Sequence, residues 1–150
     1  MLFKTHFALS IFFILLMFVF VDNKIGFIIF ALIGFVIPDM DSKYSKFGRN
    51  IFFRPLQFFL KHRGFFHSLT FGFLMAVVLG IFFPIASLGF FIGFSSHIIG
   101  DSFTIEGIAP FWPLKKRSYG FIETGSFFES IVFYSLVFID TLLLILLLFF

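Results

Sequence analysis

Apolar and polar stretches alternate along this chain, and the apolar stretches are long enough to predict its main elements. Five apolar runs cover residues 7–21, 25–37, 65–83, 85–103 and 127–150. A helix that spans the hydrocarbon core of a bilayer needs about 20 apolar residues. The runs over residues 7–21 and 25–37 are shorter than this, and the other three are close to it. The pattern therefore predicts about five short transmembrane helices that pack into a single bundle.

Two polar connections separate these runs, at residues 39–64 and 104–125. Apolar residues around Pro55 in the first connection predict an interfacial helix over residues 51–61. Pro38 ends the second run, because proline disfavours helix in the residue before it. The fourth run contains small residues that allow close helix packing in lipid: Gly89, Gly93, Ser95, Ser96 and Gly100.

Composition strengthens the membrane interpretation. The chain has 150 residues, of which 60% are hydrophobic and 13% are charged, whereas soluble domains have about half apolar and a quarter charged residues. We therefore expect an all-α integral membrane protein with one domain over residues 1–150.

The basic residues predict an orientation. If all five runs cross the membrane, the N-terminus and both polar connections share one face. That face carries every Lys and Arg except Lys24, so the positive-inside rule makes it cytoplasmic in a multi-pass protein of the inner (plasma) membrane. The cluster Lys115-Lys116-Arg117 suits anionic lipid head groups. It is too short for a nucleic-acid site, and we expect no nucleic-acid partner.

If all five runs cross the membrane in this way, seven polar side chains lie at the cytoplasmic ends of their runs. They are His6, Asp39, Asp41, His62, His67, His97 and Asp101. The chain has no cysteine, so a metal site here must use imidazole nitrogen and carboxylate oxygen. Convergence of these groups at one depth predicts a site for a divalent metal ion.

Each group also has a simpler interpretation. His97 and Asp101 share one helix face, either as a ligand pair or as a hydrogen bond at a helix end. Asp39 stands directly at the end of its run, which favours a ligand. Asp41 is a ligand or a residue of a solvated turn. His6 is a ligand or an interfacial side chain.

The segment His62-Arg63-Gly64-Phe65-Phe66-His67-Ser68 leads into the third run. Gly64 predicts a break that leaves His67 in the first turn of the next helix, with Ser68 as a possible cap. Arg63 can hold a phosphate or serve as a positive-inside anchor. Metal-binding imidazoles need hydrogen-bond acceptors, and the candidates are Asp41, Ser42, Ser68 and Ser96.

Several short motifs occur together in a characteristic order. They are Thr5-His6, Pro38-Asp39-Met40-Asp41, His62-Arg63-Gly64-x-x-His67-Ser68, Ser96-His97-x-x-x-Asp101, Gly107 and Phe111-Trp112-Pro113 followed by Arg117. Over the chain up to about residue 120, this set resembles the YdjM-type family of inner-membrane proteins, to which a metal-dependent hydrolase activity is ascribed. The resemblance implies a multi-span protein with a His/Asp metal site.

A more distant likeness concerns the metal site alone. The order of His and Asp residues resembles that of zinc-dependent phospholipase C and its nuclease relatives. This likeness implies that Asp39, His67, His97 and Asp101 hold one zinc ion and that His6 contributes to a second. Those enzymes carry further histidines after the His-x-x-x-Asp motif, whereas none follows His97. We therefore expect one or two ions, with Zn²⁺ favoured and Mn²⁺ or Mg²⁺ as alternatives.

Three functions compete at this stage. The first is a membrane-embedded hydrolase that cleaves a phosphoester of a lipid or lipid-linked substrate with metal-activated water. Its expected catalytic residues are Asp39, His62 and Arg63, where His62 binds metal or substrate and Arg63 or the 115–117 cluster holds phosphate. The alternatives are a metal transporter and a structural or regulatory protein in which a metal braces the loops. Asp140, inside the last run, is expected near the outer interface.

Overall fold

The described part of the computed structural model, residues 1–41 and 64–149, is built from helices. In chain order they are α1 (Phe3–Phe18), α2 (Lys24–Val36), the 3₁₀ helix η1 (Ile37–Asp41), the 3₁₀ helix η3 (Phe65–His67), α4 (Leu69–Phe82), α5 (Pro84–Ser102) and α6 (Phe127–Phe149). These ranges contain no strand, only two isolated β-bridges. The all-helical prediction is confirmed. The predicted interfacial helix over residues 51–61 lies outside the described residues.

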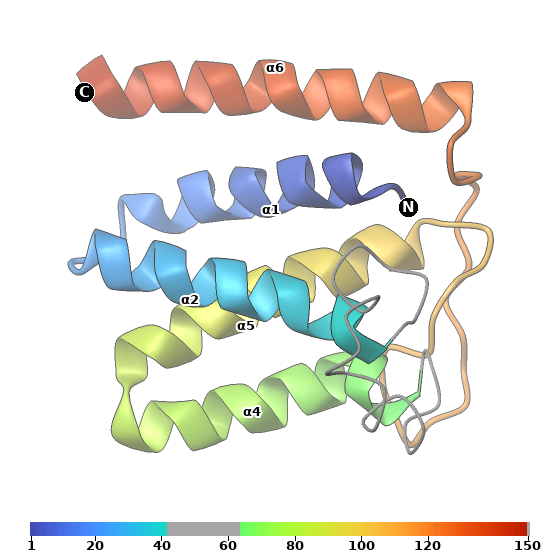
Figure 1. Ribbon diagram of the computed structural model, residues 1–150, viewed down its shortest axis with the longest axis horizontal. Helices are drawn as coiled ribbons and strands as arrows, with labels where there is room; N and C mark the ends of the chain where they lie inside the picture. Colours follow the sequence, from blue (N-terminus) through green and yellow to red (C-terminus); the bar gives the residue numbers. More distant parts are fainter. Residues whose placement is uncertain (42–63, 150) are drawn as a thin grey trace.

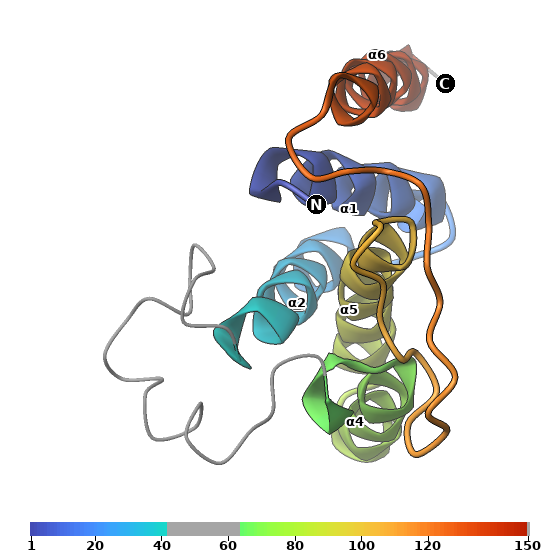
Figure 2. The same cartoon turned by 90° about the vertical axis from the view of Figure 1, so that its right-hand side faces the viewer.

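The five α-helices lie side by side, and α5 packs against α1, α2 and α4 (Figure 1). Helix α6 packs on α1 and lies at the outer edge of the bundle, on the side of α1 that faces away from α4 (Figure 2). The start of α1, the end of α2, the start of α4 and the end of α5 all lie at one end of the bundle (Figure 1). This end, called the polar end below, carries the candidate metal ligands.

Close contact between α2 and α5 depends on glycine. A Cβ atom at Gly93 would overlap the backbone carbonyl of Ala31, and a Cβ at Gly89 would lie 2.6 Å from the carbonyl oxygen of Phe27. Without side chains at these positions, the two backbones approach each other directly. The predicted role of small residues in the fourth run is confirmed at these two sites.

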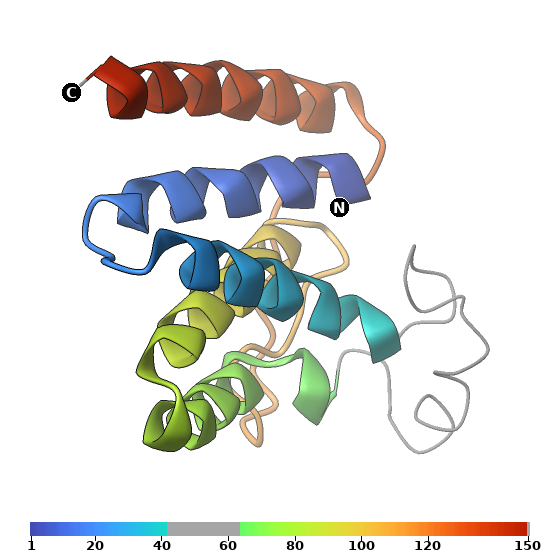
Figure 3. The same ribbon diagram turned by 60° about the vertical axis from the view of Figure 1, so that its left-hand side comes forward.

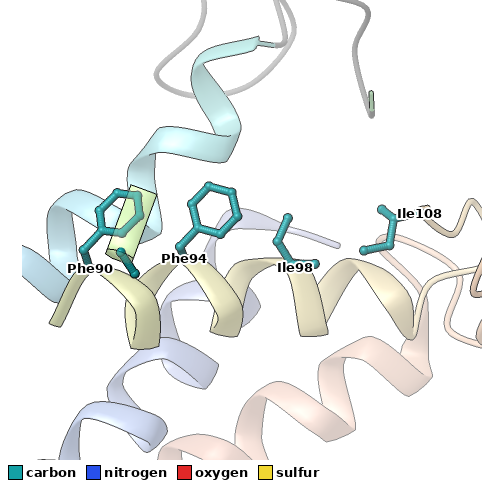
Figure 4. Packing of buried hydrophobic residues seen from close by; sticks show 5 residues of the cluster. Phe90, Phe94, Ile98 and Ile108 are labelled. Atoms are coloured by element: carbon teal, nitrogen blue, oxygen red, sulfur yellow. The ribbon is translucent and has the colours of Figure 1, made fainter. Parts of the chain in front are cut away.

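Aromatic and aliphatic side chains fill the space between α4 and α5. Phe90, Phe94 and Ile98 stand on successive turns of α5, and Ile108 from the following connection extends the same row (Figure 4). Phe94 and Ile108 are fully buried. A second cluster joins α1 to α2 through Ile14, Val21, Phe27 and Ala31, and the short turn between these two helices is visible in Figure 3. One cluster thus holds α4 against α5 and the other holds α1 against α2, and all four helices reach the polar end.

Side-chain caps set several helix boundaries. The Asn23 side chain accepts a hydrogen bond from the Gly26 N–H (3.0 Å) at the start of α2. Ser68 accepts from the Phe71 N–H (3.2 Å) and so caps α4, as predicted. Pro84 opens α5, where its missing N–H costs nothing.

Two predicted details at the polar end need correction. His67 was expected in the first turn of the third helix, but α4 begins only after Ser68 and His67 lies in η3. A solvated turn was one of the two expectations for Asp41, but this residue lies in η1, which continues from α2 through Pro38 as a 3₁₀ helix. Both changes have one physical cause, since a short tight turn satisfies backbone groups next to Pro38 and Gly64 without a full helical turn.

The connection between α5 and α6 folds back over the polar end. Thr104 pairs with Ile122, and Ile108 pairs with Ser118. The Leu69 N–H donates to the Pro110 carbonyl (2.8 Å), which ties this connection to the start of α4. Arg117, expected to hold phosphate, instead donates to the carbonyls of Glu106 (3.0 Å) and Gly107 (3.2 Å) within its own connection.

One described helix has the length and composition of a membrane span. Helix α6 has 23 residues and a mean hydropathy of 2.7 over its most apolar window, none of which is buried. Helices α1 and α4 are apolar but shorter. Large apolar side chains are exposed on the outer faces, including Phe73 and Ile81 on α4 and Phe138 on α6. Such continuous apolar surface suits lipid contact, while the number of helices that cross the membrane stays a prediction.

The contact at Gly93 provides a test of the packing. Gly93→Ala is expected to lower the free energy of unfolding by about 1–3 kcal/mol, because the added methyl group forces α2 and α5 apart. Chemical unfolding of the detergent-solubilised protein, followed by circular dichroism, measures this change. Gly80→Ala is the control, since the nearest atom to its Cβ is Ser87 Oγ at 3.3 Å. Equal stability of the two variants would contradict the proposed close packing.

Candidate metal site

Asp101 lies at the centre of the polar cluster. It stands in the last turn of α5, and its side chain is only 7% exposed. A carboxylate removed from water needs several hydrogen-bond or charge partners, since its desolvation is costly. The chain supplies these partners from two other segments, and the site is built around them.

Two imidazoles reach Asp101 from opposite parts of the chain. His6 Nε2, from α1, lies 3.0 Å from Asp101 Oδ1, and His67 Nε2, from η3, lies 2.8 Å from Asp101 Oδ2. An ionised carboxylate only accepts hydrogen bonds, so both imidazoles donate to it. Each oxygen of Asp101 thus holds one histidine, and both histidines are buried.

His97 adopts a different orientation. Its Nδ1 lies 3.1 Å from the backbone carbonyl of Phe35, and a carbonyl can only accept, so Nδ1 carries the proton. In the neutral ring, Nε2 then presents a lone pair. This atom lies 3.9 Å from both Asp39 Oδ1 and Asp101 Oδ2, which is too far for a hydrogen bond. The hydrogen bond considered above between His97 and Asp101 is therefore absent.

This arrangement fits a bound cation. A neutral His97 directs a lone pair toward two carboxylate oxygens, and a metal ion can bridge such atoms. With ligand bonds of about 2.1 Å, the ligand atoms of a tetrahedral zinc site lie about 3.4 Å apart. His97 Nε2 lies 3.9 Å from each of the two carboxylate oxygens, slightly more than that value. Ligand atoms of His6, His97 and Asp101 all lie within 4.8 Å of one another, so this group can hold a metal ion.

The imidazole rings also pack closely. The rings of His6 and His97 stack with centroids 4.3 Å apart and planes 8° from parallel. His67 meets His97 edge-on, with centroids 5.5 Å apart. Close stacking of two rings is favourable only if they are not both charged, which agrees with the neutral state that metal ligands require.

Asp39 marks the open side of the cluster. Its side chain is 20% exposed, whereas those of His6, His97 and Asp101 are at most 7% exposed. Asp39 comes from η1, so the site gathers residues from α1, η1, η3 and α5. Asp39 is the most exposed of the five side chains in the cluster.

The start of α1 is held by a residue from the last helix. Glu129 Oε1 accepts from the Leu2 N–H (2.5 Å), and Oε2 accepts from the Gly125 N–H (2.6 Å). The Glu129 N–H donates to Ser126 Oγ (3.2 Å). Ser126 therefore caps α6, while Glu129 closes the turn before this helix and also fixes the turn in which the Leu2 carbonyl accepts from the His6 N–H. Through this turn it positions His6.

The structure brings together five of the predicted site residues, namely His6, Asp39, His67, His97 and Asp101. His62 and Arg63 lie outside the described residues, as do Ser42 and the side chain of Asp41. Ser68 Oγ and Ser96 Oγ were candidate partners for the imidazoles. They donate instead to the carbonyls of Phe65 and Gly93.

Three contributors were not assigned to the site from the sequence. The Phe35 carbonyl orients His97, Gly100 makes room for His6, and Glu129 anchors α1. The pattern Ser126-x-x-Glu129 is a capping-box signature that identifies the start of α6. The sequence has no signal for the carbonyl, because it depends on how α2 and α5 are rotated against each other.

Gly100 allows a test in which no candidate ligand residue is itself replaced. A Cβ atom there would lie 2.6 Å from His6 Nδ1 and 2.9 Å from His6 Cε1. Gly100→Ala should displace the imidazole and weaken Zn²⁺ binding by about 10–100-fold, the usual effect of disturbing the support of a ligand. Competition with a chromophoric chelator measures the affinity. If Gly100→Ala binds Zn²⁺ as tightly as Gly80→Ala, His6 is not a ligand.

Comparison with known proteins places the chain in a family. It is 34% identical over 106 residues to the uncharacterized protein YvsG of Bacillus subtilis (strain 168), which covers 67% of this chain and 66% of that protein. It is 33% identical over 96 residues to the inner membrane protein YdjM of Escherichia coli (strain K12), which covers 58% and 49%. The chain thus spans about two thirds of the first relative and half of the second. No solved structure matches. All of residues 1–150 match the family described as YdjM inner membrane protein, and the chain belongs to this family.

Proposed function

We propose that this protein is a membrane-embedded, metal-dependent hydrolase that cleaves a phosphoester of a lipid or lipid-linked substrate. The observation that carries the proposal is the orientation of His97. Its Nδ1 is engaged by the Phe35 carbonyl, while its Nε2 faces Asp39 and Asp101 at 3.9 Å. A shared cation would stabilise a buried imidazole lone pair that faces two carboxylate oxygens.

The ligand set favours zinc. His6, His97 and Asp101 form the core of the proposed site, and Asp39 and His67 complete it. Mixed imidazole and carboxylate ligands without thiolate are typical of catalytic Zn²⁺, while Mn²⁺ and Mg²⁺ prefer sites richer in oxygen. When bound, such an ion supplies a water acidic enough to attack an ester near neutral pH.

The side chains around the proposed ion have distinct proposed roles. Asp101 holds His6 and His67 in place through its two oxygens. Asp39, the most exposed of the proposed ligands, is placed to accept a proton on the side open to substrate. Arg63 and His62 precede Gly64 directly in the sequence, and we propose that they bind the phosphate group.

A lipid substrate follows from the position of the site. The cluster lies at the end of an apolar bundle whose outer surface exposes side chains such as Phe73, Ile81 and Phe138. The distribution of Lys and Arg favours a cytoplasmic position for this end. The phosphate group of a lipid in the cytoplasmic leaflet would therefore lie at the same depth in the membrane as the site.

Metal analysis and turnover together test this function. The purified protein should bind one or two Zn²⁺ per chain and release phosphate, or a phosphorylated head group, from a panel of phospholipids and polyprenyl phosphates. His97→Ala and Asp101→Ala should lose metal and activity by more than the roughly 10–100-fold that follows loss of an outer hydrogen-bond partner.

The matched control is Ser87→Ala, at the opposite end of α5, where Ser87 Oγ donates to the Ala76 carbonyl (2.7 Å). This variant should keep both metal and activity. Metal binding without turnover of any substrate in the panel would contradict the hydrolase and favour a structural role. Metal uptake by proteoliposomes would instead favour transport.

A further inference from the structure

A long apolar groove runs between α1 and α6. It has a volume of about 910 Å³, and α2 contributes part of its wall. Its lining includes Ile11, Ile14 and Leu15 from α1, and Val137 and Leu144 from α6. Figure 2 shows α6 standing apart from the rest of the bundle along this side of α1. None of the residues of the metal site lines the groove, so it is a separate feature.

The groove has a charged residue near the polar end. Lys4, in the first turn of α1, lines it together with Phe3, and Lys4 Nζ lies 4.9 Å from the ring centroid of Phe133 on α6. Lys4 is exposed, so its ammonium group is available to an anion. Asp140 lines the groove farther along α6, toward the other end of the bundle. The cationic end of the groove is thus the end that holds the metal site.

Two successive layers of aromatic rings separate the groove from the metal site. Phe3 and Phe7 line the groove, and their ring centroids lie 5.6 and 5.9 Å from that of Phe35. The Phe35 ring lies 5.6 Å from the His97 ring, and its carbonyl orients His97. A molecule in the groove therefore has its Lys4 end next to the site.

The length and charge of the groove suit a lipid. The lining on α1 extends from Phe3 to Phe18, about 22 Å at 1.5 Å per residue. An extended hydrocarbon chain can lie along apolar walls of this length, and the exposed ammonium group of Lys4 at one end complements an anionic head group.

We propose that this groove binds the hydrocarbon part of a lipid phosphate, with the phosphate held at Lys4, at the end of the groove nearest the metal site. The proposal names the substrate class of the site and so rests on the proposed hydrolase. The apolar walls take the chains, and the ammonium group of Lys4 complements the phosphate. The length of about 22 Å exceeds the roughly 15 Å of one leaflet of a bilayer core, which favours long chains.

Two tryptophan variants of α6 provide a matched pair. Val137 lines the groove and Ile139 does not, although the two are similarly exposed, at 41% and 40%. Val137→Trp fills the groove, whereas Ile139→Trp adds the same side chain to another face of the helix. Leu144→Phe is a second, milder obstruction of the groove.

Lipid binding is measured on the full chain in detergent, with a chelator present so that no turnover occurs. Native mass spectrometry records the bound fraction of dioleoyl phosphatidic acid, dioleoylglycerol and a polyprenyl phosphate. Val137→Trp should lower binding of both phosphates at least about tenfold, since each displaced methylene loses its transfer free energy. Ile139→Trp should bind as the unmodified chain does. Lys4→Gln should weaken binding of phosphatidic acid but not of dioleoylglycerol.

The proposal is overturned if Val137→Trp and Leu144→Phe bind lipid as well as Ile139→Trp does. It is also overturned if the unmodified chain is a dimer that Val137→Trp dissociates, because a second copy then occupies the groove. If Lys4→Gln prefers phosphatidic acid over dioleoylglycerol as strongly as the unmodified chain does, the placement of the phosphate at Lys4 is overturned. Lipid binding by a chain that hydrolyses nothing would refute the proposed hydrolase alone, whereas hydrolysis with unaltered lipid binding in Val137→Trp would refute the groove alone.

Discussion

The buried carboxylate of Asp101 is the constraint on which the polar end of this protein depends. A charge at this depth is costly unless it is paired and hydrogen-bonded. His6 and His67 satisfy its two oxygens from segments that are 95 and 34 residues away in sequence. The need to pair the buried Asp101 carboxylate therefore holds α1 and η3 against the end of α5. The same contacts bring the remaining polar groups within reach of a single ion.

The apolar surroundings and the polar site depend on each other. Glycines such as Gly93 let α2 and α5 touch along their backbones, and this contact places the Phe35 carbonyl beside His97. A wider spacing of the two helices would leave the imidazole free to rotate. Close packing within the apolar part of the bundle thus determines which nitrogen of His97 faces the carboxylates.

Much of the architecture follows from the sequence, because apolar runs are the strongest signal available in a membrane protein. The runs indicated all five α-helices, and counting crossings placed His6, Asp39, His67, His97 and Asp101 at one end. Finer features were missed for a physical reason. The 3₁₀ turns at Asp39 and His67, the Phe35 carbonyl and the contact between Gly100 and His6 depend on helix rotation and on backbone atoms, which no residue pattern encodes.

Glu129 has a consequence for the order in which the protein matures. Its carboxylate holds the backbone at Leu2, across 127 residues of sequence, and the turn it fixes carries His6. Leu2 is translated before Glu129, so α1 has to form before this anchor exists. The backbone turn that carries His6 is secured only after α6 has begun to be made. Completion of the polar cluster is thus a late event in the synthesis of these helices.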